Sequence, residues 1–328
     1  MNEQILVSII IPVYNVERYI RRCVMSVCSQ SYSRIECVIV NDATPDNSMC
    51  IVREILQDYS GNIQFVVINH QTNKGLSVTR NDGVKAATGK YVFFLDSDDE
   101  LYSENVIDLF ASYIAKYGEA DFVLGRCNVI GGEPLSYLRE GCYKSDSIII
   151  SYLRRNWPVI ACSKFIRRDF FCENDLWFLP NLYHEDIVFS MKLAVSSSVM
   201  ISMDEYVYNY YIRDNSITTK MRLKNYMDYL YSMKMGYVFF EKHQYERLSL
   251  ELISDYYVQG FFGFLVSAIQ NPMLSKQDVI LIISSYKDTY RNMHLPIPSC
   301  WKYKVEYLFL CLSPGVFYTL IKLFHIGC

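Results

Sequence analysis

Four acidic side chains lie close together directly after one short apolar run, YVFFL at residues 91–95. The residues that follow the run are Asp96, Ser97, Asp98, Asp99 and Glu100. Alternate side chains of a strand point the same way, so we expect Asp96 and Asp98 on one face and Ser97 on the other. Two carboxylates so placed repel each other unless a cation lies between or beside them. Mg²⁺ and Mn²⁺ bind one or two protein carboxylates together with substrate phosphates, so the segment predicts a divalent-cation site.

A structural interpretation of the same acids stays open. Carboxylates after a buried strand also cap the next helix and solvate a turn. The segment lacks the glycine and the distal glutamate of a calcium-binding loop.

Elements that would position these acids are visible in the first third of the chain, where apolar runs alternate with helical patterns. The runs are 5–15, 35–42, 63–70 and 91–96, and the helical patterns are 17–30, 49–59 and 76–87. Strict alternation of strand and helix predicts an α/β fold with a mostly parallel sheet and right-handed crossovers. Ligands of such sheets bind at the carboxyl ends of the strands, which are polar here. In the first helix Arg18, Arg21 and Arg22 are expected on the outside.

The pattern changes after about residue 120. Strands are predicted at 121–130 and 205–213, and helices at 147–155 and 184–197. Beyond about Lys220 the chain has helical patterns to its end. We therefore divide it at residues 1–105, 106–218 and 219–328.

Composition excludes several classes of protein. A hydrophobic content of 51% with 20% charged residues describes a packed globular chain, and a net charge of −3 gives no basic stripe for nucleic acid. The eleven cysteines include no C-x-x-C pair, and the start MNEQILVSIIIPVYN lacks a signal-peptide pattern. We expect a reducing, cytoplasmic location. GVKAATGKY has the wrong spacing for a phosphate-binding P-loop.

Two later segments raise the question of a membrane. Residues 256–275 are uncharged but too polar to span a bilayer, and residues 307–321 are short and broken by Pro314. The tail has lysines beside aromatic and aliphatic residues, as interfacial segments do: Lys302, Lys304 and Lys322. Two interpretations stay open, a tail helix packed on the body and a peripheral contact with the inner face of the cytoplasmic membrane.

Four motifs occur in one order: PVYN, VNDATPDNS, the segment NKGLSVTRNDGVKAATGKYVFFLDSDD, and HEDIVF. With these motifs residues 5–218 resemble the family 2 glycosyltransferases, bacterial inverting enzymes that use nucleotide-sugar donors on a GT-A fold. The resemblance implies that residues 1–105 bind the nucleotide sugar and residues 106–218 bind the acceptor. The helical residues 219–328 match no motif.

The resemblance also implies a set of donor-binding residues. They are Pro12, Val13, Tyr14, Asn15, Asp42, Arg80, Asp96, Ser97 and Arg213. The loop from Pro12 to Asn15 would wrap the base in a turn that Pro12 fixes, and Asp42 would accept a hydrogen bond from the uracil ring. Ala43 stands where the family has glycine, which suggests that close backbone approach is not essential there. Arg80 would lie near base and phosphate, although a salt bridge on a helix surface explains it as well.

The catalytic roles implied by the resemblance fall on four acids. Asp98 and Asp96 would bind Mn²⁺ or Mg²⁺ at the diphosphate, and Asp186 would be the general base, with Glu185 beside it. An alternative explanation of Glu185 and Asp186 is that acids in a first helical turn complement the helix dipole. His184 is left without a role, and Lys164 is expected to serve packing.

We therefore expect an inverting transfer of sugar from a UDP-sugar to a hydroxyl of a saccharide or lipid-linked saccharide. A catalytically inactive nucleotide-sugar-binding module of a polysaccharide assembly is the alternative. A sugar nucleotidyltransferase is disfavoured, because PVYNVERY replaces the glycine-rich loop it needs after the first strand.

Overall fold

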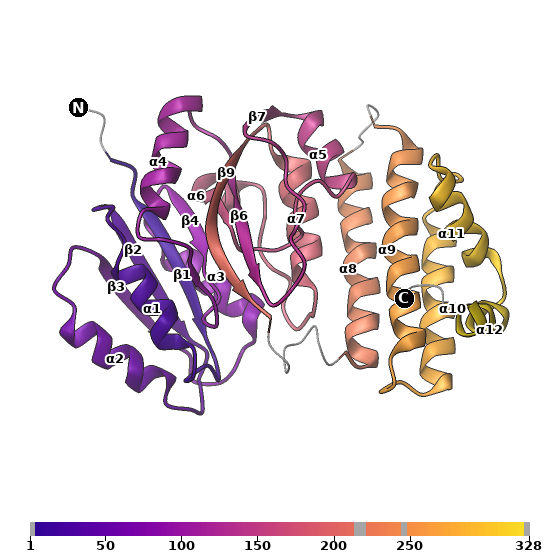
Figure 1. Cartoon of the computed structure of the whole chain (residues 1–328), viewed down its shortest axis with the longest axis horizontal. Helices are drawn as coiled ribbons and strands as arrows, with labels where there is room; N and C mark the ends of the chain where they lie inside the picture. Colours follow the sequence, from indigo (N-terminus) through magenta and orange to yellow (C-terminus); the bar gives the residue numbers. More distant parts are fainter. Residues whose placement is uncertain (1–3, 213–220, 244–247, 325–328) are drawn as a thin grey trace.

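The computed structural model describes residues 4–212, 221–243 and 248–324. In this part of the chain a nine-stranded mixed sheet is flanked by helices, and a bundle of helices follows it at one end of the molecule (Figure 1). The sheet order is β3-β2-β1-β4-β8-β6-β9-β5, with β7 paired to β9.

The first half of the sheet is the predicted parallel unit. Its elements, in chain order, are β1 (Val7–Val13), α1 (Ile20–Cys28), β2 (Ile35–Asn41), α2 (Ser48–Asp58), β3 (Gln64–Asn69), α3 (Leu76–Ala86) and β4 (Tyr91–Phe94). Strand β1 pairs in parallel with both β2 and β4, and β2 with β3. The alternating pattern therefore predicted this half correctly.

The second half of the sheet mixes directions. Its elements are β5 (Glu100–Leu101), α4 (Val106–Tyr117), β6 (Phe122–Ile130), β7 (Gly141–Lys144), α5 (Asp146–Leu153), β8 (Lys164–Arg167), α6 (Arg168–Glu173), α7 (Glu185–Ser196) and β9 (Val199–Tyr211). Strand β8 runs antiparallel between β4 and β6, whereas β6 and β9 are parallel. This arrangement joins the acidic turn after β4 to the start of β8 and to the end of β9.

Alternate residues of β1 belong to different cores, because both faces of the sheet are covered. Ile9 and Ile11 pack with α1, α2 and α4, whereas Ile10 packs with α3, α5 and α7. Burial on both sides explains why β1 has a continuous apolar sequence.

The C-terminal helices extend the second of these cores. They are α8 (Leu223–Lys242), α9 (Leu250–Gln270), α10 (Lys276–Asn292), α11 (Trp301–Cys311) and α12 (Pro314–Phe324). Residues from α8 to α12 belong to the same hydrophobic cluster as α5 and α7. Among the described residues α9 is the one helix long and apolar enough to cross a membrane, but 61% of its most apolar window is buried inside the protein. It is a core helix of the bundle.

One expectation about local backbone is wrong. Pro12 lies inside β1, opposite Val40, and fixes no turn. The chain turns only after Val13, where Asn15 has a φ of 55°. Pro12 is tolerated in the strand because β4 pairs with β1 only as far as Ile10, so no neighbour on that side needs its missing N–H.

Ala43 adopts a left-handed backbone with a φ of 53°, at the position where glycine was expected. The glycine that the family has at this position is explained by backbone conformation, since a Cβ in the left-handed region costs about 1 kcal/mol. We predict that Ala43→Gly raises the free energy of unfolding, measured in urea, by about 0.5 kcal/mol once the greater entropy of glycine in the unfolded chain is subtracted.

The matched control is Ala111→Gly in α4, where the backbone is helical. That substitution should lower stability by about 1 kcal/mol. A destabilised Ala43→Gly variant would contradict the proposed strain.

Candidate active site

The centre of the candidate site is Arg80, a buried arginine on the sheet-facing side of α3. Gly83, one turn further on, lets this helix approach the sheet. A Cβ there would lie 2.4 Å from the Cγ2 atom of Ile10. Close packing of α3 on β1 therefore places the guanidinium of Arg80 beneath the carboxyl ends of the strands.

Arg80 joins three acids that are far apart in the sequence. Its Nη2 atom lies 2.7 Å from Oδ1 of Asp96, and its Nη1 atom lies 2.8 Å from Oε1 of Glu185 and 3.3 Å from Oδ1 of Asp186. The arginine side chain is only 2% exposed, so the interpretation as a surface salt bridge is wrong. Three carboxylates around one guanidinium leave an excess of negative charge at this edge of the sheet.

The acidic turn lies beyond the end of β4, which stops at Phe94. A hydrogen bond of 3.0 Å from the amide of Asp99 to the carbonyl of Asp96 closes the turn. The strand periodicity used to place Asp96 and Asp98 on one face therefore does not apply here, because the segment is a turn and is not extended. Ser97 is buried in this turn, and Asp98 is half-buried.

Asp99 anchors the turn from inside the protein. It accepts hydrogen bonds from the hydroxyl of Tyr208 at 2.9 Å and from the amide of Tyr211 at 2.8 Å, both on β9. Burial, together with the charges of Asp98 and Asp96, raises the pKa of Asp99 to about 8. Asp99 therefore holds the turn in place, and the outer carboxylates of Asp96 and Asp98 remain at its rim.

The second pair of acids begins α7. His184 precedes the helix with a left-handed backbone (φ 61°), and Glu185 and Asp186 form its first turn. Burial raises the pKa of Glu185 to about 7, Asp186 adds to this shift, and Arg80 opposes it. Burial also raises the pKa of Asp186, against the effect of Arg80. A helix dipole alone does not describe these acids, since both also contact a buried arginine.

A loop between α5 and β8 forms the third side of the cluster. The amide of Ala161 donates to Oδ2 of Asp186 at 3.2 Å, and the thiol of Cys162 donates to Oδ2 of Asp96 at 3.1 Å. Lys164 is fully buried and donates to the carbonyls of Pro158 and Ile160. Burial lowers the pKa of Lys164 to about 8. The packing role expected for this lysine thus has a specific form, because it holds the loop that contacts both acids.

Asp42 lies in a separate cluster, at the ends of β2 and β3. Its Oδ1 atom is 2.7 Å from Nδ1 of His70 and accepts from the amide of Lys74 at 2.8 Å, and Oδ2 accepts from the amide of Gly75 at 2.9 Å. The side chain is buried, with one lone pair of Oδ2 left for a further donor. Asp42 therefore ties the start of α3 to the strand ends.

The loop after β1 is the most open part of the candidate donor site. Pro12 and Val13 are buried in the strand, whereas Tyr14 and Asn15 are exposed. The amide of Asn15 donates to the hydroxyl of Thr44 at 2.8 Å, which links this loop to the loop after β2. Arg213 lies outside the described residues.

Arg22 contacts the acidic turn, although the helical pattern placed it on the outside of α1. Its guanidinium lies 3.6 Å from the centre of the Tyr211 ring and donates to the carbonyl of Asp98. It also lies 3.7 Å from Glu100. Arg22 therefore supports the turn from the side opposite Arg80.

Residues that sequence reasoning missed contribute mostly through the backbone or a buried polar atom. They are Arg22, Ala161, Cys162, Tyr208 and Tyr211. The order of polar residues at strand ends pointed to His70, but no local pattern marks a backbone amide or a buried thiol as part of a site.

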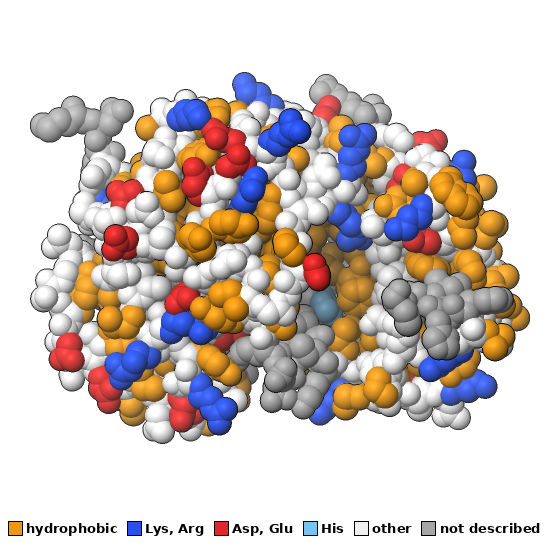
Figure 2. Space-filling view, viewed as in Figure 1, with side chains coloured by type: hydrophobic (Ala, Val, Ile, Leu, Met, Phe, Trp, Pro, Cys, Tyr) orange, Lys and Arg blue, Asp and Glu red, His pale blue; other side chains and the backbone are white. Residues whose placement is uncertain are grey.

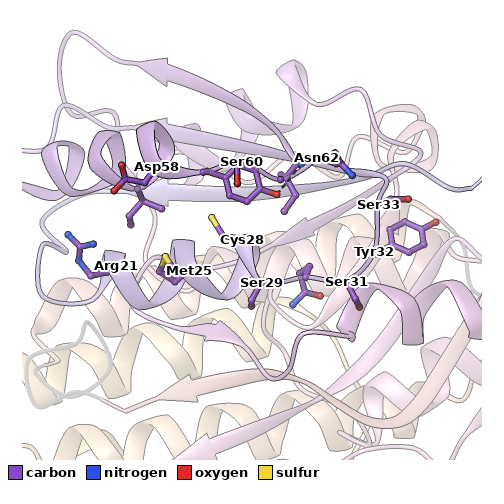
Figure 3. A pocket seen from close by; sticks show the side chains of 15 residues that line it. Arg21, Met25, Cys28, Ser29, Ser31, Tyr32, Ser33, Asp58, Ser60 and Asn62 are labelled. Carbon is purple, nitrogen blue, oxygen red and sulfur yellow. Dashed lines mark hydrogen bonds between the residues drawn. The ribbon is translucent and has the colours of Figure 1, made fainter.

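Two pockets differ in their position, one far from the candidate site residues and one next to Asp42. One of about 720 Å³ is formed by the C-terminal ends of α1 and α2, with Arg21, Met25 and Asp58 on its walls (Figure 3). No candidate site residue lines it. A second of about 540 Å³ includes His70, Lys74 and Asp82 and so adjoins Asp42. Figure 2 shows a further hollow in the surface between the sheet and α8.

A resident metal site can be tested against the donor set. Among the described residues no three His, Cys, Asp or Glu side chains are grouped to hold an ion. The acidic turn still fits a cation that takes its remaining ligands from phosphate and water, as Mg²⁺ and Mn²⁺ do. Its carboxylates lie at the rim of a cluster with surplus negative charge.

Comparison with known proteins identifies the family. The model of glycosyl transferase family 2 matches residues 8–180. The chain belongs to this family. A relative in Escherichia coli K12, "Uncharacterized glycosyltransferase YibD", is 30% identical over 237 residues, which cover 69% of this chain and 67% of the relative.

Two further comparisons concern polymers of the cell envelope and the fold. The poly(ribitol-phosphate) beta-glucosyltransferase of Bacillus spizizenii is 29% identical over 213 residues, 63% of this chain and 32% of that protein. The crystal structure of S. aureus TarS 1-349 in complex with UDP-GlcNAc superposes with a TM-score of 0.76 at 20% identity, covering 98% of this chain and 92% of that one. This likeness confirms the GT-A fold of the chain.

The cluster around Arg80 generates a stability prediction. Arg80→Met leaves carboxylates buried without their cation, and breaking a buried pair in this way costs about 3 kcal/mol in the free energy of unfolding at pH 8. Arg80 opposes the raised pKa of Glu185 and Asp186, so in its absence these acids bind protons more readily. The loss should therefore shrink as the pH falls from 8 to 5.

Urea unfolding at both pH values measures this effect. Arg21→Met is the matched control, because Arg21 pairs with Glu54 on the surface at 57% exposure. It should stay within about 0.5 kcal/mol of the wild type at either pH. Equal losses in the free energy of unfolding for the two variants would show that the buried ion pairs of Arg80 stabilise the fold no more than the surface pair of Arg21.

Proposed function

We propose that this family 2 glycosyltransferase transfers a sugar, with inversion, from a UDP-sugar to a hydroxyl of a saccharide or lipid-linked saccharide. The observation that supports this most directly is the contact of Arg80 with both Asp96 and Asp186. Acids proposed for the donor and for the acceptor are thereby held at the two ends of one guanidinium. A transfer reaction needs such a fixed relation between the leaving group and the base.

Asp186 is the proposed general base. Its side chain is 23% exposed, and its two oxygens are oriented by Arg80 and by the amide of Ala161. Burial raises its pKa and makes the carboxylate a stronger base than a free aspartate. A base of this kind takes the proton of the acceptor hydroxyl as the oxygen attacks the anomeric carbon from the side opposite the diphosphate. Glu185 is more deeply buried and shares the same arginine.

Asp98 and Asp96 are the proposed ligands of Mn²⁺ or Mg²⁺. Such an ion, when bound, neutralises charge that develops on the departing diphosphate. The protein's own contribution is the turn, which Asp99 fixes to β9 and Arg22 supports from α1. Both carboxylates are thereby presented at the rim in a defined position.

The donor's nucleotide is proposed to lie along the ends of β1, β2 and β3. Asp42 retains one lone pair for the ring N–H of uracil, and the pocket that includes His70 adjoins it. Tyr14 and Asn15 are exposed in the loop that would cover the base. Arg80 and Ser97 are the proposed contacts of the phosphates, and the same role predicted for Arg213 stays a prediction from the sequence. The UDP-GlcNAc bound to TarS supports a uridine nucleotide, given the shared fold.

The proposal also covers the binding roles of the two halves of the sheet domain and the location of the enzyme. Residues 1–105 bind the donor, residues 106–218 bind the acceptor, and the enzyme works in the cytoplasm on polymers of the cell envelope. The similarity to a poly(ribitol-phosphate) beta-glucosyltransferase supports a polymer acceptor. A catalytically inactive binding module is the competing proposal, and it predicts binding without turnover.

Metal-dependent binding of the nucleotide tests the role of Asp98. Calorimetry with UDP should show tighter binding in Mn²⁺ than in EDTA for the wild type, by roughly tenfold to a hundredfold for one charge-assisted interaction. Asp98→Ala should bind UDP equally in both buffers. Asp58→Ala, at an exposed acid of α2, is the control and should keep the metal-dependent gain. A gain preserved in Asp98→Ala would remove Asp98 from the site.

Loss of the base tests whether the protein is an enzyme of this mechanism. Asp186→Asn should transfer sugar about 10²–10⁴ times more slowly than the wild type while its affinity for UDP with Mn²⁺ stays unchanged. Asp204→Asn, at an acid that pairs with Arg126 on the surface, should be fully active. Wild-type activity in Asp186→Asn would place the base elsewhere, and an inactive wild type would favour the binding module.

A further inference from the structure

Helix α11 has two apolar faces, of which only one is used inside the protein. Tyr303, Tyr307 and Leu310 pack against the core of the helical bundle. Trp301 and Leu308 point away from it, with 78% and 63% of their surfaces exposed. A residue at i and one at i+7 lie on the same side of a helix, so these two side chains form one outward stripe. Trp301 is more exposed than any other large apolar side chain described.

The neighbouring residues enlarge this stripe to a surface. Ile297 before α11 is 59% exposed, and Val316 and Leu323 on α12 are 48% and 68% exposed. The rings of Phe309 and Phe317, with centres 6.3 Å apart, join the two helices. We call these five residues, Ile297, Trp301, Leu308, Val316 and Leu323, the C-terminal apolar surface. Figure 2 shows hydrophobic side chains on this end of the molecule, with basic and some acidic side chains among them.

The charge around the C-terminal apolar surface is positive. Residues 289–328 contain four basic side chains and one acidic one, although the whole chain has a net charge of −3. Lys302, Lys304 and Lys322 are exposed. The acidic residue, Glu306, is half-buried, and burial raises its pKa. The exposed charges described on α11 and α12 are therefore all lysines.

We propose that the C-terminal apolar surface docks the protein on an anionic lipid bilayer, with α11 and α12 lying in the plane of the interface. Tryptophan is enriched at the level of the lipid head groups, and lysines beside it reach anionic lipid with their long side chains. A second copy of the chain fits this surface less well, because its lysines would meet lysines of the same sign. The proposal does not depend on the catalytic roles assigned above.

The apolar part of the contact extends beyond one side chain. Trp301 and Leu308 lie on α11, whereas Val316 and Leu323 lie on α12, so both of these neighbouring helices carry exposed apolar groups. Binding strength in such contacts grows with the apolar area buried and with the attraction to anionic lipid. Removing either contribution should therefore weaken binding, and removing both should abolish it.

Flotation of the full chain with vesicles tests the proposal. Wild type should float with vesicles of 30% phosphatidylglycerol in phosphatidylcholine, about tenfold or more above its recovery with pure phosphatidylcholine, and salt should reduce the binding. The double variant Trp301→Ser and Leu308→Ser, which keeps the lysines, should bind the anionic vesicles about tenfold or more weakly than the wild type. The variant Lys302→Gln and Lys304→Gln should bind about fivefold to thirtyfold more weakly, since each lysine contributes roughly fivefold.

The matched controls lie at the other end of the molecule. Met25→Ser removes an apolar side chain that is 49% exposed, and Lys90→Gln removes an exposed lysine. Both should float as the wild type does. Thermal unfolding and UDP binding, unchanged in all four variants, show that the fold is kept.

Three outcomes overturn the proposal. The first is that the wild type stays in solution with the anionic vesicles. The second is that the variants of the C-terminal apolar surface float as well as the wild type does. Alternatively, size-exclusion chromatography shows a wild-type dimer that Trp301→Ser with Leu308→Ser converts to a monomer, without any binding to vesicles. That last result would assign the surface to self-association instead.

Discussion

A buried guanidinium that must be neutralised on three sides constrains the rest of this structure. Taking one ion out of water costs several kcal/mol, and only close partners with good geometry offset that cost. Arg80 has such partners in Asp96 and Glu185, which come from the turn after β4 and from the start of α7. Helix α3, the acidic turn and α7 are therefore fixed relative to one another by the same atom group. Gly83 belongs to this constraint, because a side chain there would push α3 away from Ile10.

The constraint extends into the C-terminal helices, which support the site from behind. Helix α8 packs against α7, and Gly236 of α8 lies beside Met191 of α7, where a Cβ would make ordinary contact at 3.6 Å. The amide of Tyr183, just before the proposed catalytic acids, donates to Asp228 on α8 at 3.0 Å. One hydrophobic cluster runs from the sheet through α7 into α12. Changes in the helical bundle should therefore affect the position of Asp186 through α7, although no residue of the bundle belongs to the recognised motifs.

How far the sequence predicts this molecule depends on the range of the interaction. Apolar runs and helical spacing depend on neighbouring residues, so β1 to β4, with α1 to α3 between them, were predictable, and so were the acids at the strand ends. Pairs such as Arg80 with Glu185 arise only when α3 and α7 meet on the sheet, and no local pattern encodes that meeting. Pro12 was assigned to a turn because proline usually ends a strand, yet β4 stops early enough to tolerate it. The sequence of residues 91–98 suggests an extended backbone for Asp96 and Asp98. The residue at which β4 ends depends on its pairing with β1 and β8, which the local sequence does not encode.

If the proposed function is right, the surplus of negative charge at the site explains why the donor diphosphate would bind together with a cation. Asp96, Glu185 and Asp186 outnumber the one guanidinium among them, and Asp98 adds a further carboxylate at the rim. A diphosphate approaching this edge is repelled unless positive charge arrives with it. The buried Lys164, whose ammonium group donates to backbone carbonyls of the adjacent loop, offsets part of this surplus at Asp186, because its charge lowers the pKa of that acid. Burial, with a contribution from the neighbouring carboxylates, raises the pKa of Glu185 and Asp186. On the proposed function this makes them better bases, and the surplus of negative charge makes binding of a nucleotide diphosphate depend on an accompanying cation.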